Sequence, residues 1–177
     1  MAGGLSWLIL AYRVPGEPSR LRAAVRRRLK GAGAVYLAQS VAALPASAAA
    51  ARILRGLRND IGVMGGSAQL LVAETVAGEM HVVWLFNTAR DDEYAQIIAA
   101  CDDLYSDVES LLAERCTPAD LTQGERELTR LTRRDKQVRA ADFFGASRAD
   151  MAAAALARCR DALSRLADAV TRIRATD

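Results

Sequence analysis

Short apolar runs alternate with helix-length segments over the first 76 residues, and this alternation constrains the fold more than any other feature. Residues 7–14 are an almost unbroken apolar run, which is typical of a strand buried on both faces. A proline- and glycine-containing turn follows, and residues 20–32 have the length of a helix. Two further apolar runs, 34–37 and 41–44, predict neighbouring strands joined by a tight turn.

A second helix and a fourth strand complete this pattern. Ser47 is positioned to cap a helix that continues to a glycine pair at Gly65. Residues 68–76 then read as another strand. The order strand, helix, strand, strand, helix, strand predicts a ferredoxin-like layer. The apolar face of the second helix should consist of Ile53, Leu54, Leu57, Ile61 and Met64.

The remainder of the chain has a helical pattern. Residues 80–86 fit a strand or a helix, and we favour a helix from about Glu79 because no breaker follows. Pro118 suits the first position of another helix, and Ser147 is expected to cap the last one. Two apolar seams recur at intervals of three and four residues: Tyr94, Ile97, Cys101, Leu104, Val108 and Leu111, then Met151, Ala155, Cys159, Leu163, Leu166, Val170 and Ile173.

We therefore predict an α+β protein with two domains. Residues 1–77 should form the ferredoxin-like layer, and residues 78–177 an antiparallel helical pair or trio that shares one core with it. A homodimer interface is the alternative use of the two seams. The aromatic pair at Phe143 and Phe144 should lie in a loop and plug the core.

Charge is distributed very unevenly. Residues 1–60 hold ten basic and two acidic side chains, whereas residues 61–125 hold two basic and twelve acidic ones. The net charge of the 177-residue chain is only +3. Such blocks indicate an electrostatic surface for a charged partner, or halves that dock on one another. The acidic clusters at 91–93 and 102–103 are expected to form the docking face, with a divalent-ion site as the alternative.

The first predicted helix is the most basic segment of the chain. Its inward face should contain Leu21, Val25 and Leu29, so most of its cations point outward. A solvated arginine face and a surface that follows DNA phosphates are both consistent with this pattern. The candidate DNA-binding residues are Arg20, Arg22, Arg26, Arg27 and Lys30. No base-reading motif accompanies them, so the pattern favours nucleic-acid contact over sequence recognition.

Arg28 differs from these residues because the helical period places it on the inward stripe beside Leu29. A buried arginine needs a partner, and we expect a bent-out side chain or a salt bridge to an acid of the helical half. The sharper alternative is an anion site formed by Arg13, Ser19 and Arg28, since helix N-termini and arginine forks bind tetrahedral oxyanions. Chromate, sulfate and phosphate would fit equally well.

Enzymatic chemistry has no positive support in the sequence. His81 is the only histidine and has no metal-ligand partner at a suitable spacing, and no phosphate-binding loop is present. We expect no cofactor and no metal. Three widely spaced cysteines do not make a disulfide framework, and the N-terminal apolar run is too short to cross a membrane. A cytoplasmic protein without membrane contact is therefore expected.

The N-terminal segment resembles the N-terminal domain of the ChrB-type chromate-resistance regulators. The resemblance lies in the strand that ends Tyr12-Arg13-Val14-Pro15, the turn Glu17-Pro18-Ser19-Arg20, Arg22, Arg27-Arg28-Leu29-Lys30, Gly33-Ala34-Val35-Tyr36-Leu37 and Leu44-Pro45. Weaker matches are Phe86-Asn87, Ala89-Arg90-Asp91, Glu93-Tyr94 and Asp142-Phe143-Phe144-Gly145.

The resemblance implies a regulator of a chromate-resistance operon that binds duplex DNA and responds to chromate. ChrB-type regulators usually carry a further C-terminal domain, and a chain ending at Asp177 is expected to be a stand-alone N-terminal domain. The alternative is an accessory protein, possibly enzymatic, that binds an oxyanion or a small molecule in a pocket between sheet and helices.

Overall fold

The computed structural model describes residues 4–15, 19–114 and 116–174, without the side chains of Ser19 and Arg174. The expected turn at Glu17-Pro18 and capping by the Ser19 side chain lie outside this description. The chain divides into two compact units, Met1–Ala89 with Ala141–Phe144, and Arg90–Ala140 with Gly145–Asp177. These units separate between Ala89 and Arg90, within the long helix that begins at Glu79. The predicted boundary between two folding domains after residue 77 stays a prediction.

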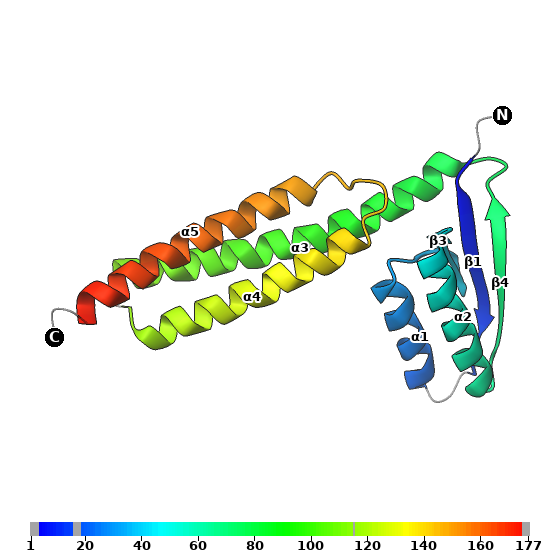
Figure 1. Ribbon diagram of the computed structural model, residues 1–177, viewed down its shortest axis with the longest axis horizontal. Coiled ribbons are helices and arrows are strands. Elements are labelled where there is room, and N and C mark those ends of the chain that lie inside the picture. Colours follow the sequence, from blue (N-terminus) through cyan, green and yellow to red (C-terminus); the bar gives the residue numbers. More distant parts are fainter. Residues whose placement is uncertain (1–3, 16–18, 115, 175–177) are drawn as a thin grey trace. The chain divides into compact units, whose positions relative to one another are not determined.

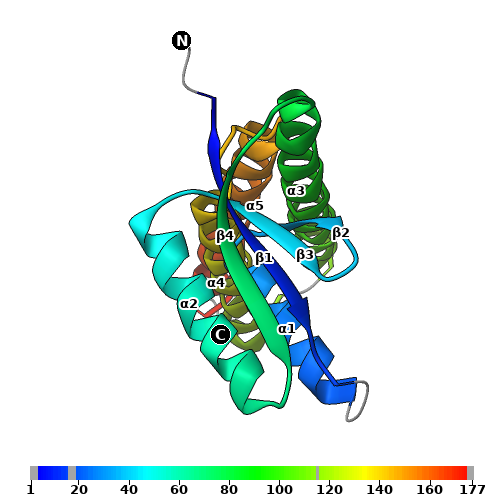
Figure 2. The same ribbon diagram turned by 90° about the vertical axis from the view of Figure 1, so that its right-hand side faces the viewer.

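The first unit contains a four-stranded antiparallel sheet of order β2-β3-β1-β4 (Figures 1 and 2). Two helices, α1 and α2, are interleaved with the strands. This is the predicted ferredoxin-like arrangement. The elements are β1 (Ser6–Arg13), α1 (Ser19–Gly31), β2 (Val35–Ala38), β3 (Val41–Pro45), α2 (Ala48–Val63) and β4 (Ser67–Glu74).

The core of this unit forms over β1, one of the two inner strands of the sheet. Leu8 and Leu10 are buried, as predicted, and cluster with Val25 and Leu29 of α1 and with Leu54, Leu57 and Ile61 of α2. Successive residues of a strand point to opposite faces, so Trp7 lies on the other face. There its ring stacks on that of Phe86, with centroids 5.6 Å apart.

Local sequence accounts for the boundaries of these elements. The hydroxyl of Ser47 accepts a 3.1 Å hydrogen bond from the backbone N–H of Ala50, which confirms the predicted cap. Ser40 adopts a positive φ of 63° in the turn between β2 and β3. Gly66 is required by packing, because an added Cβ would lie 2.4 Å from the carbonyl oxygen of Arg13. The α2 face is narrower than predicted: Ile53 is 45% exposed, since the sheet covers only the stripe through Leu54 and Leu57.

The second unit is the trio of helices allowed by the sequence. It comprises α3 (Glu79–Ala113) from Arg90 onward, α4 (Pro118–Ala140) and α5 (Ala149–Arg174). The helical interpretation of residues 80–86 is confirmed, because α3 begins at Glu79. Among the described residues, no helix is long and apolar enough to span a membrane. Buried seam residues of α3 and α5 fill a single core cluster with Leu131 and Val138 of α4.

The predicted seams are buried in their centres and less buried toward their ends. Leu111 and Ile173 are only partly buried. Met151 is 59% exposed, because the buried stripe of α5 begins at Ala152. Within this core α4 approaches α5 closely, since a Cβ on Gly124 would lie 2.5 Å from Leu163 Cδ2.

Asp91 holds the loop before α5. The hydroxyl of Ser147 donates a 2.9 Å hydrogen bond to the Asp91 carboxylate, and the backbone N–H of Arg148 donates one of 2.8 Å. The prediction that Ser147 caps α5 is therefore wrong, since its side chain serves α3 instead. Thr117 does cap α4 and exchanges hydrogen bonds with Asp120.

The acidic face of α3 also pairs differently from the expectation. Asp102 forms an ion pair with Arg158, and Glu109 pairs with Arg165, so these acids pair with α5 and not with the basic first half. Over the part of the chain that the structure describes, no group of three potential metal ligands is found.

Replacing Phe86 by Ala should destabilise the protein by about 3–5 kcal/mol, because it removes a ring that is 1% exposed and leaves a cavity beside Trp7 and Phe144. Urea denaturation followed by circular dichroism measures the loss. Phe143 is 42% exposed, so Phe143→Ala is a matched control with an expected loss of less than about 1.5 kcal/mol. Equal losses for both variants would contradict this packing.

Thiol reagents should not modify Cys101 or Cys159 in the folded protein at pH 8. Burial raises the pKa of Cys101 to about 12 and also raises that of Cys159, so both remain protonated, and both are fully buried. Peptide mapping after alkylation, with and without denaturant, checks the result. Rapid native labelling of either cysteine would contradict it.

Candidate nucleic-acid interface

The orientation of α1 is determined by its apolar stripe. Val25 and Leu29 are fully buried against the sheet. The helical period then turns the cations outward, and all five predicted DNA-binding residues have exposed side chains: Arg20, Arg22, Arg26, Arg27 and Lys30. Their exposure agrees with the sequence pattern, and their contact with DNA remains a prediction.

Helix α2 adds arginines that the sequence analysis did not assign to the interface. Arg52, Arg55 and Arg58 are exposed and recur every third residue, off the buried stripe of α2. Helices α1 and α2 lie side by side on one face of the sheet (Figures 1 and 2). We define the α1–α2 basic surface as the outward residues of both helices: Arg20, Arg27, Lys30, Arg52 and Arg55.

Carboxylates are almost absent from these two helices. The described part of α1 contains none, and Asp60 is the only acid in α2. Asp60 forms an ion pair with Arg28 of α1. Within the described residues, Arg20, Arg27, Arg52 and Arg55 have no carboxylate partner, so their charge faces solvent.

The expectation that the Arg28 side chain bends out from the apolar stripe is confirmed, whereas the expected location of its partner is wrong. Its side chain is 47% exposed, and its partner Asp60 belongs to α2 and not to the helical half of the chain. The physical reason is the neighbouring helix: Arg28 lies at the margin of the apolar stripe, on the side where α2 packs, and its long side chain extends across to Asp60.

Helix α1 separates two residues of the candidate anion site, Ser19 and Arg28. Ser19 begins this helix and Arg28 lies in its last turn, nine residues further on, which corresponds to a rise of about 14 Å. Arg13 is exposed at the end of β1. Binding of an oxyanion by Arg13, Ser19 and Arg28 remains a prediction. The carboxylate of Asp60 would compete with such an anion for Arg28.

Arg26 is held at the other flank of α1, above the edge strand β2. Its guanidinium lies 5.9 Å from the ring centroid of Tyr36, a cation–π distance. The hydroxyls of Tyr36 and Tyr12 are 2.9 Å apart. Burial, together with the hydrogen bond to Tyr12, raises the pKa of Tyr36, so the phenol stays neutral and the positive charge of Arg26 is not cancelled.

The charges in the first turn of α1 lower the stability of this helix. It contains Arg20 and Arg22 and no acidic residue, although the N-terminus of a helix favours negative charge. Each such cation costs about 0.3–1 kcal/mol of helix stability at an exposed site.

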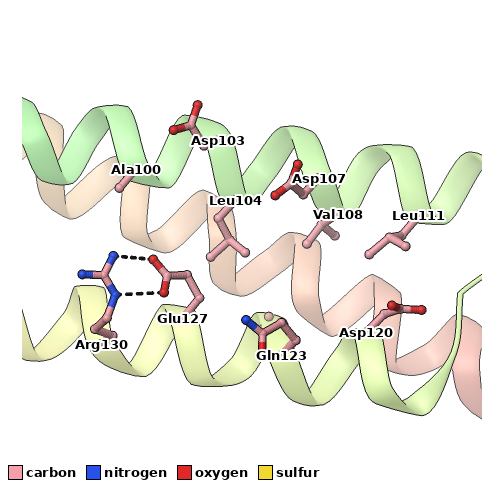
Figure 3. A pocket seen from close by; sticks show the side chains of 11 residues that line it. Ala100, Asp103, Leu104, Asp107, Val108, Leu111, Asp120, Gln123, Glu127 and Arg130 are labelled. Atoms are coloured by element: carbon pink, nitrogen blue, oxygen red, sulfur yellow. Dashed lines mark hydrogen bonds and ion pairs between the residues drawn. The ribbon is translucent and has the colours of Figure 1, made fainter.

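A hollow in the second unit has the opposite charge. It has a volume of about 460 Å³ and lies between α3 and α4 (Figure 3). Leu104, Val108 and Leu111 line it together with four carboxylates, and one of these, Glu127, forms an ion pair with Arg130. Hydrogen bonds from Thr117 lower the pKa of Asp120 and keep it ionised. A tetrahedral dianion would be repelled from this hollow, so it does not supply the oxyanion pocket considered as an alternative.

The fold and the surface together define an α+β protein whose sheet is covered by a basic helical layer and followed by a three-helix bundle. The family model described as "Protein ChrB, N-terminal" matches residues 22–176. The chain belongs to this family, which confirms the resemblance and implies a role in chromate resistance. No curated protein and no solved structure matched the chain.

The Arg28–Asp60 pair should contribute little to stability. Both side chains are 47% exposed, and solvent screens such pairs to about 0.2–1 kcal/mol. A double-mutant cycle with Arg28→Ala and Asp60→Ala, measured by chemical denaturation, gives the interaction energy. A coupling above about 2 kcal/mol would mean that the pair is structural and would remove Arg28 from the candidate site residues.

Proposed function

We propose that this protein is a DNA-binding regulator of chromate resistance that contacts duplex phosphates with the α1–α2 basic surface. The observation that carries the proposal is the set of exposed arginines without carboxylate partners among the described residues: Arg20, Arg27, Arg52 and Arg55. Family membership supports the association with chromate resistance.

The placement of the charges suits a polyanion. The arginines stand on two helices that are fixed by a fully buried core, so their positions are held without a loop having to become ordered. Phosphate contacts provide affinity and orientation without reading bases. The surface therefore supports binding to duplex DNA in general, and the operator sequence would need additional contacts.

The proposal predicts a strong salt dependence. If three or four cations of this surface contact phosphates, the logarithm of the affinity should fall with the logarithm of salt concentration at a slope of about −3 to −4 per protomer. Arg27→Ala should weaken binding to all duplexes alike and make the slope shallower by about 1. Fluorescence anisotropy over a salt series measures both quantities.

Arg160→Ala is the matched control for Arg27→Ala, because Arg160 is also exposed but lies on α5 in the second unit. It removes the same charge and should leave the slope unchanged. Absence of duplex binding at about 50 mM salt, where the phosphate term is large, would reject the proposed function.

Removing the carboxylate of Asp60 should have the opposite effect. Asp60→Asn abolishes the negative charge that pairs with Arg28 and leaves the guanidinium available at the edge of the α1–α2 basic surface. Binding should become tighter, with a slope steeper by up to about 1. Weaker binding by a folded Asp60→Asn variant would show that the two helices do not contact DNA in the proposed way.

A further inference from the structure

The sheet of the first unit has one long edge without the usual protection. Strand β4 is last in the order β2-β3-β1-β4, and all eight of its residues pair with β1 in unbroken register. Its other side therefore presents backbone N–H and C=O groups that lack a strand partner within the sheet. An edge of this kind is a template for pairing with another strand.

The opposite edge shows how such pairing is normally prevented. Strand β2 has only four residues, and its register against β3 shifts between Tyr36 and Ala38. Strand β4 has neither feature, and its sequence SAQLLVAE contains no proline, lysine or arginine. Two of its apolar side chains are largely exposed, Leu71 at 51% and Val72 at 72%. In the described part of the chain, shortness and a register shift thus protect β2, and β4 has neither of them.

We propose that β4 pairs antiparallel with β4 of a second copy of this chain, which joins the two sheets into one of eight strands. The sequence of β4 suits pairing with itself. With a two-fold axis at Leu71, this residue lies beside its own copy, Leu70 beside Val72, and Gln69 beside Ala73. The only charged residue, Glu74, then lies beside Ala68, so no like charges oppose one another.

A symmetric antiparallel pair also fixes the orientation of the two copies. Directly opposite residues of antiparallel strands point to the same face, so the two-fold axis must be perpendicular to the sheet. Both helical layers then lie on the same side of the eight-stranded sheet. The dimer would present two copies of the α1–α2 basic surface related by a two-fold axis, which is the symmetry by which dimeric proteins match duplex half-sites. This consequence rests on the proposed function, whereas the strand pairing does not.

The sequence analysis considered the apolar seams of α3 and α5 as a possible dimer interface. These seams are buried against one another within a single chain. Tyr94, Ile97 and Cys101 of α3 are fully buried in the same cluster as Cys159 and Leu166 of α5. A second copy has little apolar seam left to cover there. The exposed apolar residues of the β4 edge remain available, which favours strand pairing as the mode of self-association.

Sedimentation equilibrium at tens of micromolar protein tests the pairing. We expect the wild-type chain to have twice its 19.0 kDa mass, and Leu71→Lys to have the mass of a single chain, because the variant places two ammonium groups side by side at the axis. Val63→Lys is the matched control: Val63 is 89% exposed, ends α2, and lies off the edge, so this variant should stay dimeric. A monomeric wild type, or a Leu71→Lys variant that remains dimeric, would overturn the proposal.

Cross-linking gives a second measurement that does not depend on destabilising the dimer. Leu71→Cys should be linked to its own copy by a short bis-maleimide, whereas Val63→Cys should not, and Cys101 and Cys159 are buried and should not react. Failure of Leu71→Cys to cross-link would likewise overturn the pairing.

The outcomes for pairing and for DNA binding can be told apart. Leu71→Lys leaves the α1–α2 basic surface intact, so its monomer should still bind DNA, with about half the salt slope of the dimer. Arg27→Ala should lose DNA affinity and remain dimeric. A dimer that binds no DNA would reject the proposed function and leave the strand pairing standing.

Discussion

Burial of the apolar stripes of α1 and α2 against the sheet is the interaction on which the rest of the first unit depends. Val25 and Leu29 contribute one stripe, and Leu54, Leu57 and Ile61 the other. Removing such side chains from water stabilises the fold by about 1.5–3 kcal/mol each. Because a helix has only one rotational setting that buries its stripe, the same burial forces the arginines of both helices to the outside. The charged surface is therefore a consequence of the core.

The two units use charge in different ways. In the second unit, acids of α3 are paired with arginines of α5, as for Asp102 with Arg158 and Glu109 with Arg165. In the first unit, Asp60 is the one acid on α1 and α2 among the described residues, and it pairs with Arg28 only. Exposed ion pairs contribute little to stability. The main effect of the ion pairs between α3 and α5 is therefore that the paired charges cancel one another's electric field. Arg20, Arg27, Arg52 and Arg55 have no carboxylate partner among the described residues, so a polyanion would be attracted to them over a Debye length of about 8–10 Å.

Much of the fold could be predicted because its signals are local. Alternating apolar runs and turn residues gave the four strands in order, and the seam from Tyr94 to Val108 is buried as expected. The errors fall where a side chain had two competing partners, or where the position of a neighbouring helix decided burial. Ser47 caps α2, but Ser147, in a similar sequence position, bonds to Asp91 because the loop returns to α3 there. Met151 matches the heptad spacing and is nevertheless exposed, since the bundle covers α5 only from Ala152 onward.

The sequence by itself determined which face of each helix is apolar and therefore that Arg20, Arg27 and Lys30 point outward, because the helical period is an intrinsic property of the backbone. Only the tertiary structure decided what lies beside each helix. It placed Asp60 next to Arg28, added Arg52 and Arg55 to the same basic surface, and left β4 as the long outer strand of the sheet that the structure describes. These features depend on strand order and on the side-by-side packing of α1 and α2. Lateral neighbours of this kind are set by residues far apart in the chain, so no local pattern specifies them.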